Sequence, residues 1–270
     1  MRNRWHRPYV LLQHIIDIIE SAAPLRWQEA WDNSGLQVGE PNAAIQKALL
    51  TTDVTEDVVS EAIMYHCDLI VSHHPLLFKG LKSLTGRTPQ ERIVRDAIRH
   101  GIAIYSAHTS MDSAPEGVSG RMARIIGLKD CRILCPQTDR ETGVTYGLGM
   151  IGQLAEPMPL GELMQMIRER FEAPMLRYVG DPSQLIATLA LCGGAGAEFT
   201  DEAIRQGADA YLTADMKYHT MLDAKGRIAL IDMDHWVSEH FTRDIFGELL
   251  AGKVETRIAT SDQTPVKIYN

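Results

Sequence analysis

Short apolar runs alternate along the chain with segments whose apolar residues recur at helical spacing. Runs of this length and composition predict buried strands, and those of the first half are Lys47–Thr52, Asp68–Ser72 and Ile102–Ala107. The segments between them predict helices over Glu56–Tyr65 and Gln90–His100. Gly101 follows the second helix, where a left-handed C-terminal cap is common. The alternation indicates an α/β protein whose helices cover a mainly internal sheet.

Two parts of the chain share a pattern. Glu61-Ala62-Ile63 precedes the apolar strand Asp68–Ser72, and Glu202-Ala203-Ile204 precedes a similar strand over Ala208–Thr213 at the same spacing. A chance likeness between two helix-to-strand segments is the alternative, because one repeat is weaker evidence than a tandem array. The pattern predicts two related α/β units, the second of which spans Asp130–Arg227.

Composition and charge narrow the class of protein. The 270 residues, 45% of them hydrophobic, are enough for a large core. A formal net charge of -8 argues against a nucleic-acid surface, because phosphate binding requires a basic patch. The basic segment Met1–Arg7 precedes a helical pattern over Val10–Glu20 with no clear cleavage site, and no apolar run is long enough for a membrane span. We therefore expect a cytoplasmic protein.

A pair of adjacent histidines, His73 and His74, follows the predicted strand Asp68–Ser72 directly. Ligands of α/β sheets collect beyond the carboxyl ends of strands. Adjacent residues of an extended strand point to opposite faces, and Pro75 prevents the strand from continuing regularly. Each histidine can therefore serve its own metal ion, or both can serve one ion if the chain turns. The alternative is a pair of core histidines.

The next predicted strand also ends in polar residues, His108 and, after a short turn, Asp112. A carboxylate complements imidazole in sites for transition metals. We take Asp112 as a metal ligand and His108 as a group that orients a ligand or substrate. The alternative for Asp112 is a turn-forming aspartate bonded to its own backbone.

The third element, Asp234–His240, follows an apolar run over Ile228–Ile231. If a helix begins near His235, then His235 and Glu239 lie on one face, because they are four residues apart. An exposed helical pair is the alternative. His235 and Glu239 join the three ligands proposed above, so there are five candidate ligands in all: His73, His74, Asp112, His235 and Glu239. Five ligands exceed a closed tetrahedral site and suit two divalent ions, for which zinc, iron and manganese are equally suitable.

Two further segments carry polar or flexible residues after apolar runs. Cys192–Gly196 precedes a predicted helix over Thr200–Gln206 and could present backbone amides to an anion, although a tight structural turn fits the sequence better. Asp215 and His219 follow the strand over Ala208–Thr213. We treat them as candidate residues of a substrate pocket.

Taken in order, the motifs of this chain resemble one family, the dinuclear metal-centre proteins described as GTP cyclohydrolase I type 2 homologues or Ngg-one-interacting-factor-three-like proteins. The segments that carry the resemblance are Trp31–Gly39, His73–Leu76, His108–Asp112, Thr213–Asp215 and His235–Glu239. The chain departs from the family pattern at Asp234 and Ala214, where family members often have glycine. These departures keep every ligand but could reshape the pocket.

The resemblance implies a metal pair bridged by Glu239. His74 and Asp112 would complete the ligands of one ion, and His73 and His235 those of the other. It also implies two interleaved, three-layer α/β/α units, one formed by residues 1–129 together with 228–270 and the other by residues 130–227. Members of the family form toroidal homohexamers whose metal sites face an internal cavity.

These observations predict a metal-dependent hydrolase that acts on a nucleotide or related small heterocycle. Metal-activated water would attack an electrophilic carbon or phosphorus, and a GTP cyclohydrolase reaction would open the guanine ring at C8. His108 is the candidate for proton transfer, because the unperturbed pKa of histidine is about 6.5. Two alternatives remain open: a non-catalytic metal-binding scaffold with protein partners, and a phosphoesterase.

Overall fold

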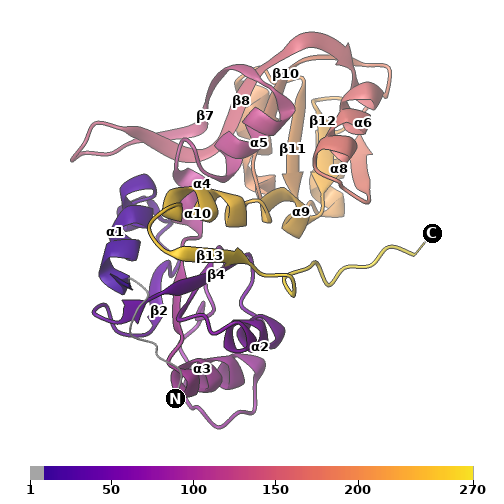
Figure 1. Ribbon diagram of the computed structural model, residues 1–270. Helices are drawn as coiled ribbons and strands as arrows, with labels where there is room; N and C mark the ends of the chain where they lie inside the picture. The colour runs from indigo at the N-terminus through magenta and orange to yellow at the C-terminus, as the bar shows by residue number, and fades with distance from the viewer. Residues whose placement is uncertain (1–8, 270) are drawn as a thin grey trace. The chain divides into compact units, whose positions relative to one another are not determined.

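The structure is a computed structural model that describes residues 9–269, so the segment Met1–Arg7 lies outside the described residues. The chain divides into two compact units (Figure 1). The first comprises Met1–Met111 and Phe241–Gln263, and the second comprises Asp112–His240 and Thr264–Asn270. Each unit has its own mixed sheet and its own hydrophobic core, which confirms the predicted α/β class.

A five-stranded sheet forms the centre of the first unit, in the order β13-β4-β5-β6-β2. Its strands are β2 (Gly35–Val38), β4 (Lys47–Thr51), β5 (Leu69–Ser72), β6 (Ala103–Ser106) and β13 (Glu255–Ile258). All neighbours run parallel except β2, which pairs antiparallel with β6. A separate antiparallel pair is formed by β1 (Val10–Leu11) and β3 (Ala44–Ile45).

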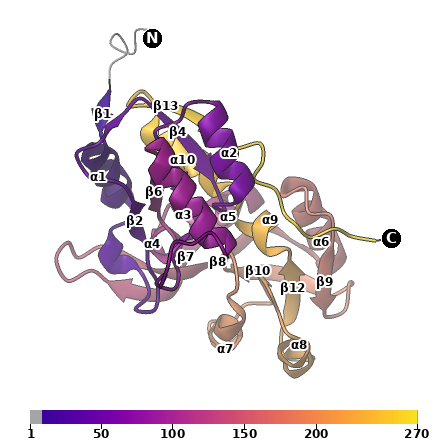
Figure 2. The same ribbon diagram turned by 90° about the horizontal axis from the view of Figure 1, so that it is seen from below.

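Helices cover both faces of this sheet (Figure 2). They are α1 (Leu12–Ala22), α2 (Glu56–Met64), α3 (Pro89–His100) and α10 (Thr242–Leu250), and a 3-10 turn, η1, spans Leu25–Trp27. α2 packs with α3 on one face, and α1 packs with α10 on the other. The hydroxyls of Thr55 and Thr88 accept backbone N–H bonds at the starts of α2 and α3, and Gly101 ends α3 with a φ of 67°. Leu49, Ile70 and other apolar residues form the core under α2 and α3.

The second unit is built on a six-stranded sheet in the order β7-β8-β10-β11-β12-β9. Its strands are β7 (Lys129–Thr138), β8 (Thr145–Pro159), β9 (Leu176–Val179), β10 (Leu185–Leu191), β11 (Ala210–Ala214) and β12 (Ala229–Met233). β10, β11 and β12 run parallel, while β8 and β9 pair antiparallel with them at either side. β7 and β8 form a long antiparallel hairpin, seen in Figure 1.

The helices of the second unit range in length from five to eleven residues. They are α5 (Val118–Ile126), α6 (Leu160–Arg170), α7 (Thr200–Arg205), α8 (Tyr218–Ala224), α9 (His235–Glu239) and a 3-10 turn, η2 (Ala197–Phe199). α5 and α6 pack together against β8 and β10, whereas α7 and α8 contact β11 and β12. α4 (Thr109–Ser113) begins in the first unit and ends in the second. Tyr211 and Leu230 lie in the core beneath α7 and α8.

The repeated sequence pattern corresponds to repeated structure within the two units. In the first, Ala48 pairs with Leu69 across β4 and β5, and in the second, Leu189 pairs with Ala210 across β10 and β11. A carboxylate repeats as well. Asp68 Oδ2 accepts bonds from the backbone N–H groups of Gln46 and Lys47, at 2.8 and 3.2 Å. In the second unit, Asp209 Oδ2 accepts those of Ala187 and Thr188, at 2.9 and 2.8 Å. The two units therefore share both the strand register and the carboxylate hydrogen bonds at the spacing of the sequence pattern.

The boundaries of the units differ from those expected over residues 1–129 with 228–270. In the structure, 112–129 and 228–240 belong to the second unit. α5 packs against β8, which draws the earlier segment into that unit. β12 pairs with β11 and β9, so the apolar run before His235 extends the second sheet rather than the first.

Candidate metal centre

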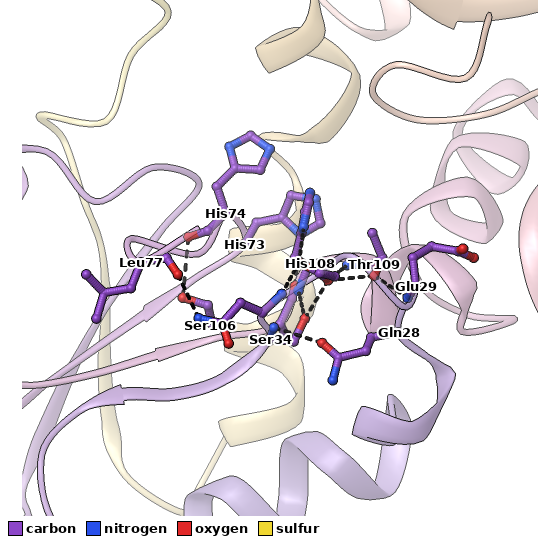
Figure 3. Close-up of polar contacts among 12 residues, drawn as sticks. Gln28, Glu29, Ser34, His73, His74, Leu77, Ser106, His108 and Thr109 are labelled. Carbon is purple, nitrogen blue, oxygen red and sulfur yellow. Dashed lines mark hydrogen bonds and ion pairs between the residues drawn. The ribbon is translucent and has the colours of Figure 1, made fainter. Parts of the chain in front are cut away.

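Three imidazoles of the first unit gather at the carboxyl ends of β5 and β6. His73 and His74 follow β5, and His108 follows β6. Nitrogen atoms of the three rings lie within 4.8 Å of one another. Figure 3 shows the three side chains together, above Ser34 and Thr109. The parallel pairing of β5 with β6 explains this meeting, because it brings the ends of both strands to one edge of the sheet.

Each of these rings is held through its Nδ1 atom. His73 Nδ1 lies 2.9 Å from the carbonyl oxygen of Ala107, His74 Nδ1 lies 2.9 Å from Asp53 Oδ1, and His108 Nδ1 lies 2.8 Å from Asp32 Oδ1. A carbonyl or carboxylate oxygen only accepts, so each Nδ1 carries the proton and donates it. In the neutral ring the lone pair then resides on Nε2, which is the arrangement typical of metal-binding histidines.

The segment Trp31–Gly39 explains how His108 is fixed. Asp32 Oδ2 accepts bonds from the backbone N–H of Thr109 at 3.0 Å and from its hydroxyl at 2.5 Å, and Ser34 Oγ donates to the same oxygen at 2.9 Å. Burial alone would raise the pKa of Asp32, but the hydrogen bonds from His108 and Thr109 outweigh it and hold that pKa well below its usual range. Asp32 is therefore an ionised acceptor that anchors His108.

In the second unit, His235 and Glu239 lie one helical turn apart on α9, as the spacing predicts. His235 Nε2 is 3.0 Å from Glu239 Oε2, and His235 Nδ1 is 2.7 Å from Asp215 Oδ2. Asp234 begins the helix, because its side chain accepts the backbone N–H of Val237 at 3.2 Å. The departure from glycine at this position therefore supplies a helix cap.

Buried carboxylates accompany this imidazole. Glu239 is 2% exposed and Asp112, at the end of α4, is 9% exposed. An oxygen of Asp112 lies within 4.8 Å of an oxygen of Glu239. Both charges act on Cys192: burial raises the pKa of its thiol, and the two carboxylates raise it further. Two like charges at such a separation repel each other, and a cation between them would offset that repulsion.

The glycine-rich segment after β10 forms a turn against α9. The N–H groups of Gly194 and Gly196 donate to the hydroxyls of Ser238 and Thr213, each at 2.9 Å. These amides serve the protein's own side chains, so the structural turn describes the segment better than an anion cradle. A Cβ atom at Gly194 would overlap Glu239 Oε1 and approach the His235 ring at 3.5 Å. The turn thus leaves room for the Glu239 carboxylate.

A pocket of about 280 Å³ lies beside His235 in the second unit. Asp215 contributes to its lining together with Arg177 and Asp232, which form an ion pair. His219 lies elsewhere: it is exposed on α8, with its ring centroid 5.3 Å from that of Tyr218. Of the two candidate pocket residues, only Asp215 lines this pocket and contacts a candidate ligand.

The donor set fits divalent ions. In the first unit, three imidazoles are held through Nδ1 with Nε2 presented. In the second unit, the His235 ring contacts the carboxylates of Asp215 and Glu239, which add oxygen donors. Nitrogen with carboxylate oxygen suits zinc, iron and manganese. The absence of a Cβ at Gly194 provides the space that the Glu239 oxygen occupies. The structure therefore contains clusters of histidine and carboxylate that could hold metal ions.

Sequence reasoning did not assign the side chains that hold these imidazoles. Asp32 and Asp53 were not singled out, and Asp215 was assigned to a pocket rather than to His235. Asp32 belongs to the Trp31–Gly39 motif, which is recognisable in the sequence. That Asp32 orients His108 could not be predicted, because it depends on this segment meeting the end of β6. Gly194 was considered only as part of a turn.

Comparison with known proteins identifies the family. Residues 10–265 match the sequence profile described as Duf34/NIF3 (NGG1p interacting factor 3). The chain belongs to this family. A Clostridium acetobutylicum member named GTP cyclohydrolase 1 type 2 homolog is 34% identical over 229 residues, which cover 84% of this chain and 85% of the relative. A Clostridium perfringens relative of the same name is 35% identical over 230 residues, covering 84% and 86%.

Solved structures of the Duf34/NIF3 fold agree with this assignment. The crystal structure of a hypothetical protein from Staphylococcus aureus has a TM-score of 0.87 and 28% identity, covering 96% of this chain and 99% of that one. A Bacillus cereus protein related to NIF3 shares the fold with the same TM-score at 24% identity, covering 97% and 99%. Among the described residues, none of the helices has the length and apolar character needed to cross a membrane.

Proposed function

We propose that the chain holds two divalent metal ions through His73, His74, Asp112, His235 and Glu239 and uses them to hydrolyse a nucleotide. The observation that carries the proposal is the fixed tautomer of the strand-end imidazoles: the rings of His73, His74 and His108 are bonded through Nδ1 to an acceptor oxygen, so each presents Nε2. Such fixed orientation is characteristic of metal ligands and of groups that act beside them. The names of the curated relatives support a nucleotide as the substrate.

Each residue has a distinct part in the proposal. His73 and His74 come from one strand end and are oriented by Ala107 and Asp53. Glu239 is the bridging carboxylate, since its buried position beside His235 and Asp112 suits a ligand shared by two ions. When bound, the ions would lower the pKa of water and neutralise negative charge that develops on the substrate.

His108 is the proposed proton-transfer group. Its Nδ1 atom donates to Asp32, and its ring belongs to the same cluster as those of His73 and His74. The hydrogen bond to Asp32 fixes the orientation of the His108 ring and leaves Nε2 as the atom through which a proton would pass to or from the substrate. Asp215 orients His235 in the same manner. The homohexamer that the resemblance implies and the cytoplasmic location expected from the sequence are also part of the proposal.

Metal analysis and turnover assays test this proposal together. Metal per chain is measured for the wild type, Asp112→Ala, Glu239→Gln and the control Asp57→Ala, whose carboxylate is exposed on α2. We expect two ions in the wild type and the control, about one in Asp112→Ala, and loss of both in Glu239→Gln. GTP and a panel of nucleotides and phosphomonoesters are then assayed with each metal-loaded protein.

The outcomes separate the functional classes. Hydrolysis by the wild type and the control, but not by Asp112→Ala, supports the hydrolase, and the product distinguishes ring opening from phosphoester cleavage. A wild type that binds metal yet leaves the whole panel untouched, as Asp112→Ala does, would favour a metal-binding scaffold. The name NGG1p interacting factor in the family description makes a protein partner the natural candidate in that case. A wild type that binds no metal would overturn the proposal altogether.

A further inference from the structure

Two large aromatic side chains lie half exposed next to the histidine cluster of the first unit. Trp31 is 59% exposed and Phe78 is 49% exposed. Their ring centroids are 5.8 Å apart, with the planes tilted by 50°. Leaving two aromatic rings partly in water forgoes the free energy that burial would give them. Exposed apolar groups that adjoin a candidate site often mark the place where a ligand binds.

His108 joins this aromatic pair to the other histidines. Its ring lies edge-on to Trp31 at 6.0 Å and to Phe78 at 6.5 Å between centroids. The same ring lies 5.3 Å from that of His73 and 5.4 Å from that of His74. A ligand that covers Trp31 and Phe78 therefore lies directly beside the imidazole donors.

Both aromatic residues are held in place by their chain neighbours. Asn33 Nδ2 donates to the carbonyl oxygen of Leu77 at 2.7 Å, and the Leu77 N–H donates to Gln37 Oε1 at 3.1 Å. These bonds tie the segment that carries Phe78 to the segment that carries Trp31. A platform fixed in this way binds a ligand with less loss of conformational entropy than two mobile side chains would.

Charge on the same loop restricts the ligand further. Lys79 and Lys82 follow Phe78 closely and are exposed. Aromatic faces attract either planar rings or cations, and positive charges one and four residues after Phe78 favour an anionic substituent over a cation. The combination favours a planar heteroaromatic ring that bears an anionic group such as phosphate.

We propose that Trp31 and Phe78 form a stacking platform for the heteroaromatic ring of a phosphorylated substrate, which places that substrate beside His108. This inference rests on the proposed function, because it takes the histidine cluster as the reacting site. Stacking of a base on an aromatic side chain contributes enough affinity to be measured by removing one ring. Trp31 and Phe78 are thereby specificity-determining residues.

Binding of two probes to the metal-loaded full chain tests the platform. The probes are guanosine 5'-monophosphate, which carries a heteroaromatic ring, and ribose 5-phosphate, which lacks it. Affinities are measured by calorimetry for the wild type, Trp31→Ala, Phe78→Ala and Trp31→Phe, and for the control Tyr9→Ala, which removes another exposed aromatic ring. Both alanine variants should bind the nucleotide about tenfold more weakly. The affinity of both alanine variants for ribose 5-phosphate should be unchanged. Trp31→Phe should keep most of the wild-type affinity for the nucleotide, because it retains an aromatic ring.

The ratio of the two affinities decides the outcome, and metal per chain is measured in parallel. A wild type that does not prefer the nucleotide, or alanine variants that retain its preference, would overturn the platform. An equal loss for both probes, or a loss of metal, would show that the variants disturb the site as a whole and would count against stacking. Absence of turnover in the wild type would overturn the proposed function instead, since the affinity ratio is measured without turnover.

Discussion

Gly194 leaves the space that the carboxylate of Glu239 occupies. A Cβ atom at this position would overlap Glu239 Oε1, and the φ of Gly194 is 61°, a left-handed conformation that suits glycine. The Gly194 N–H also donates to Ser238, the residue next to Glu239. The turn after β10 and the helix α9 therefore fit together only when residue 194 has no side chain.

Gly194→Ala should weaken metal binding more than it weakens the fold. The left-handed backbone costs about 1 kcal/mol for alanine, whereas the overlap with Glu239 must move the proposed bridging carboxylate. We expect metal per chain to fall by at least one ion, measured by elemental analysis after dialysis. Gly207→Ala is the matched control, because Gly207 has a φ of 81° with open space around its Cβ direction. Equal metal content in the two variants would contradict the role of Gly194.

Asp53→Asn should lower metal affinity about 10- to 100-fold without unfolding the protein, as is usual for residues that orient a metal-bound histidine. The amide group of asparagine can offer His74 Nδ1 either an N–H donor or an oxygen acceptor. It therefore no longer selects the tautomer of His74 whose Nε2 lone pair can bind a metal ion. Competition with a chelator of known affinity measures the change. Asp57→Asn on α2 is the control, because it removes an exposed carboxylate close in sequence. Unchanged affinity in Asp53→Asn would remove Asp53 from the proposed site.

The gathering of the strand-end histidines was predictable from sequence, but the groups that orient them were not. His73, His74 and His108 follow apolar runs that are recognisable as strands, and parallel pairing brings such ends together. Asp32 is 76 residues from His108 in sequence, and their meeting depends on β2 pairing with β6. That pairing is a tertiary contact, which local periodicity does not encode.

The fold was predicted in a similar way. The strands and helices that local patterns predicted agree with the structure within about two residues, and the likeness of Asp68–Ser72 to the strand after Ala208 indicated the repeat. Elements such as β7, β9, β13 and α5 were not predicted. The boundaries between units depend on which sheet β12 joins, which is a tertiary contact. An apolar run of five residues fits either sheet equally well.

Asp68→Ala and Asp209→Ala should destabilise the protein by similar amounts, roughly 1 to 3 kcal/mol each. Each carboxylate accepts two backbone N–H bonds from the start of the neighbouring strand, so its removal leaves the same pair of donors without that acceptor. Urea unfolding measures the loss, with Asp223→Ala on the exposed surface of α8 as the control. A large effect at one position and none at the other would show that the two units share the geometry of these hydrogen bonds but not their contribution to stability.

A buried carboxylate ties the C-terminal part of the first unit to α2. Glu61 is 6% exposed and accepts the backbone N–H bonds of Thr260 and Ser261, the latter at 2.8 Å, together with both of their hydroxyls. Burial raises the pKa of Glu61, but the bonds from Ser261 and Thr260 outweigh it and lower the pKa from 4.5 to about 2. The folded state therefore holds the ionised form of Glu61 more strongly than the unfolded state does.

Glu61→Gln should lower the free energy of unfolding at pH 7 by about 3 kcal/mol, because each unit of pKa shift corresponds to about 1.4 kcal/mol. The depressed pKa means that this contribution is complete above pH 4.5 and is lost as the pH falls from 4.5 towards 2. The difference in stability between wild type and variant should therefore shrink across that window. Urea unfolding at several pH values measures it, and Asp57→Asn on the same helix should show no such convergence. A constant difference from pH 7 to pH 3 would mean that the ionised carboxylate of Glu61 is not what secures Thr260 and Ser261.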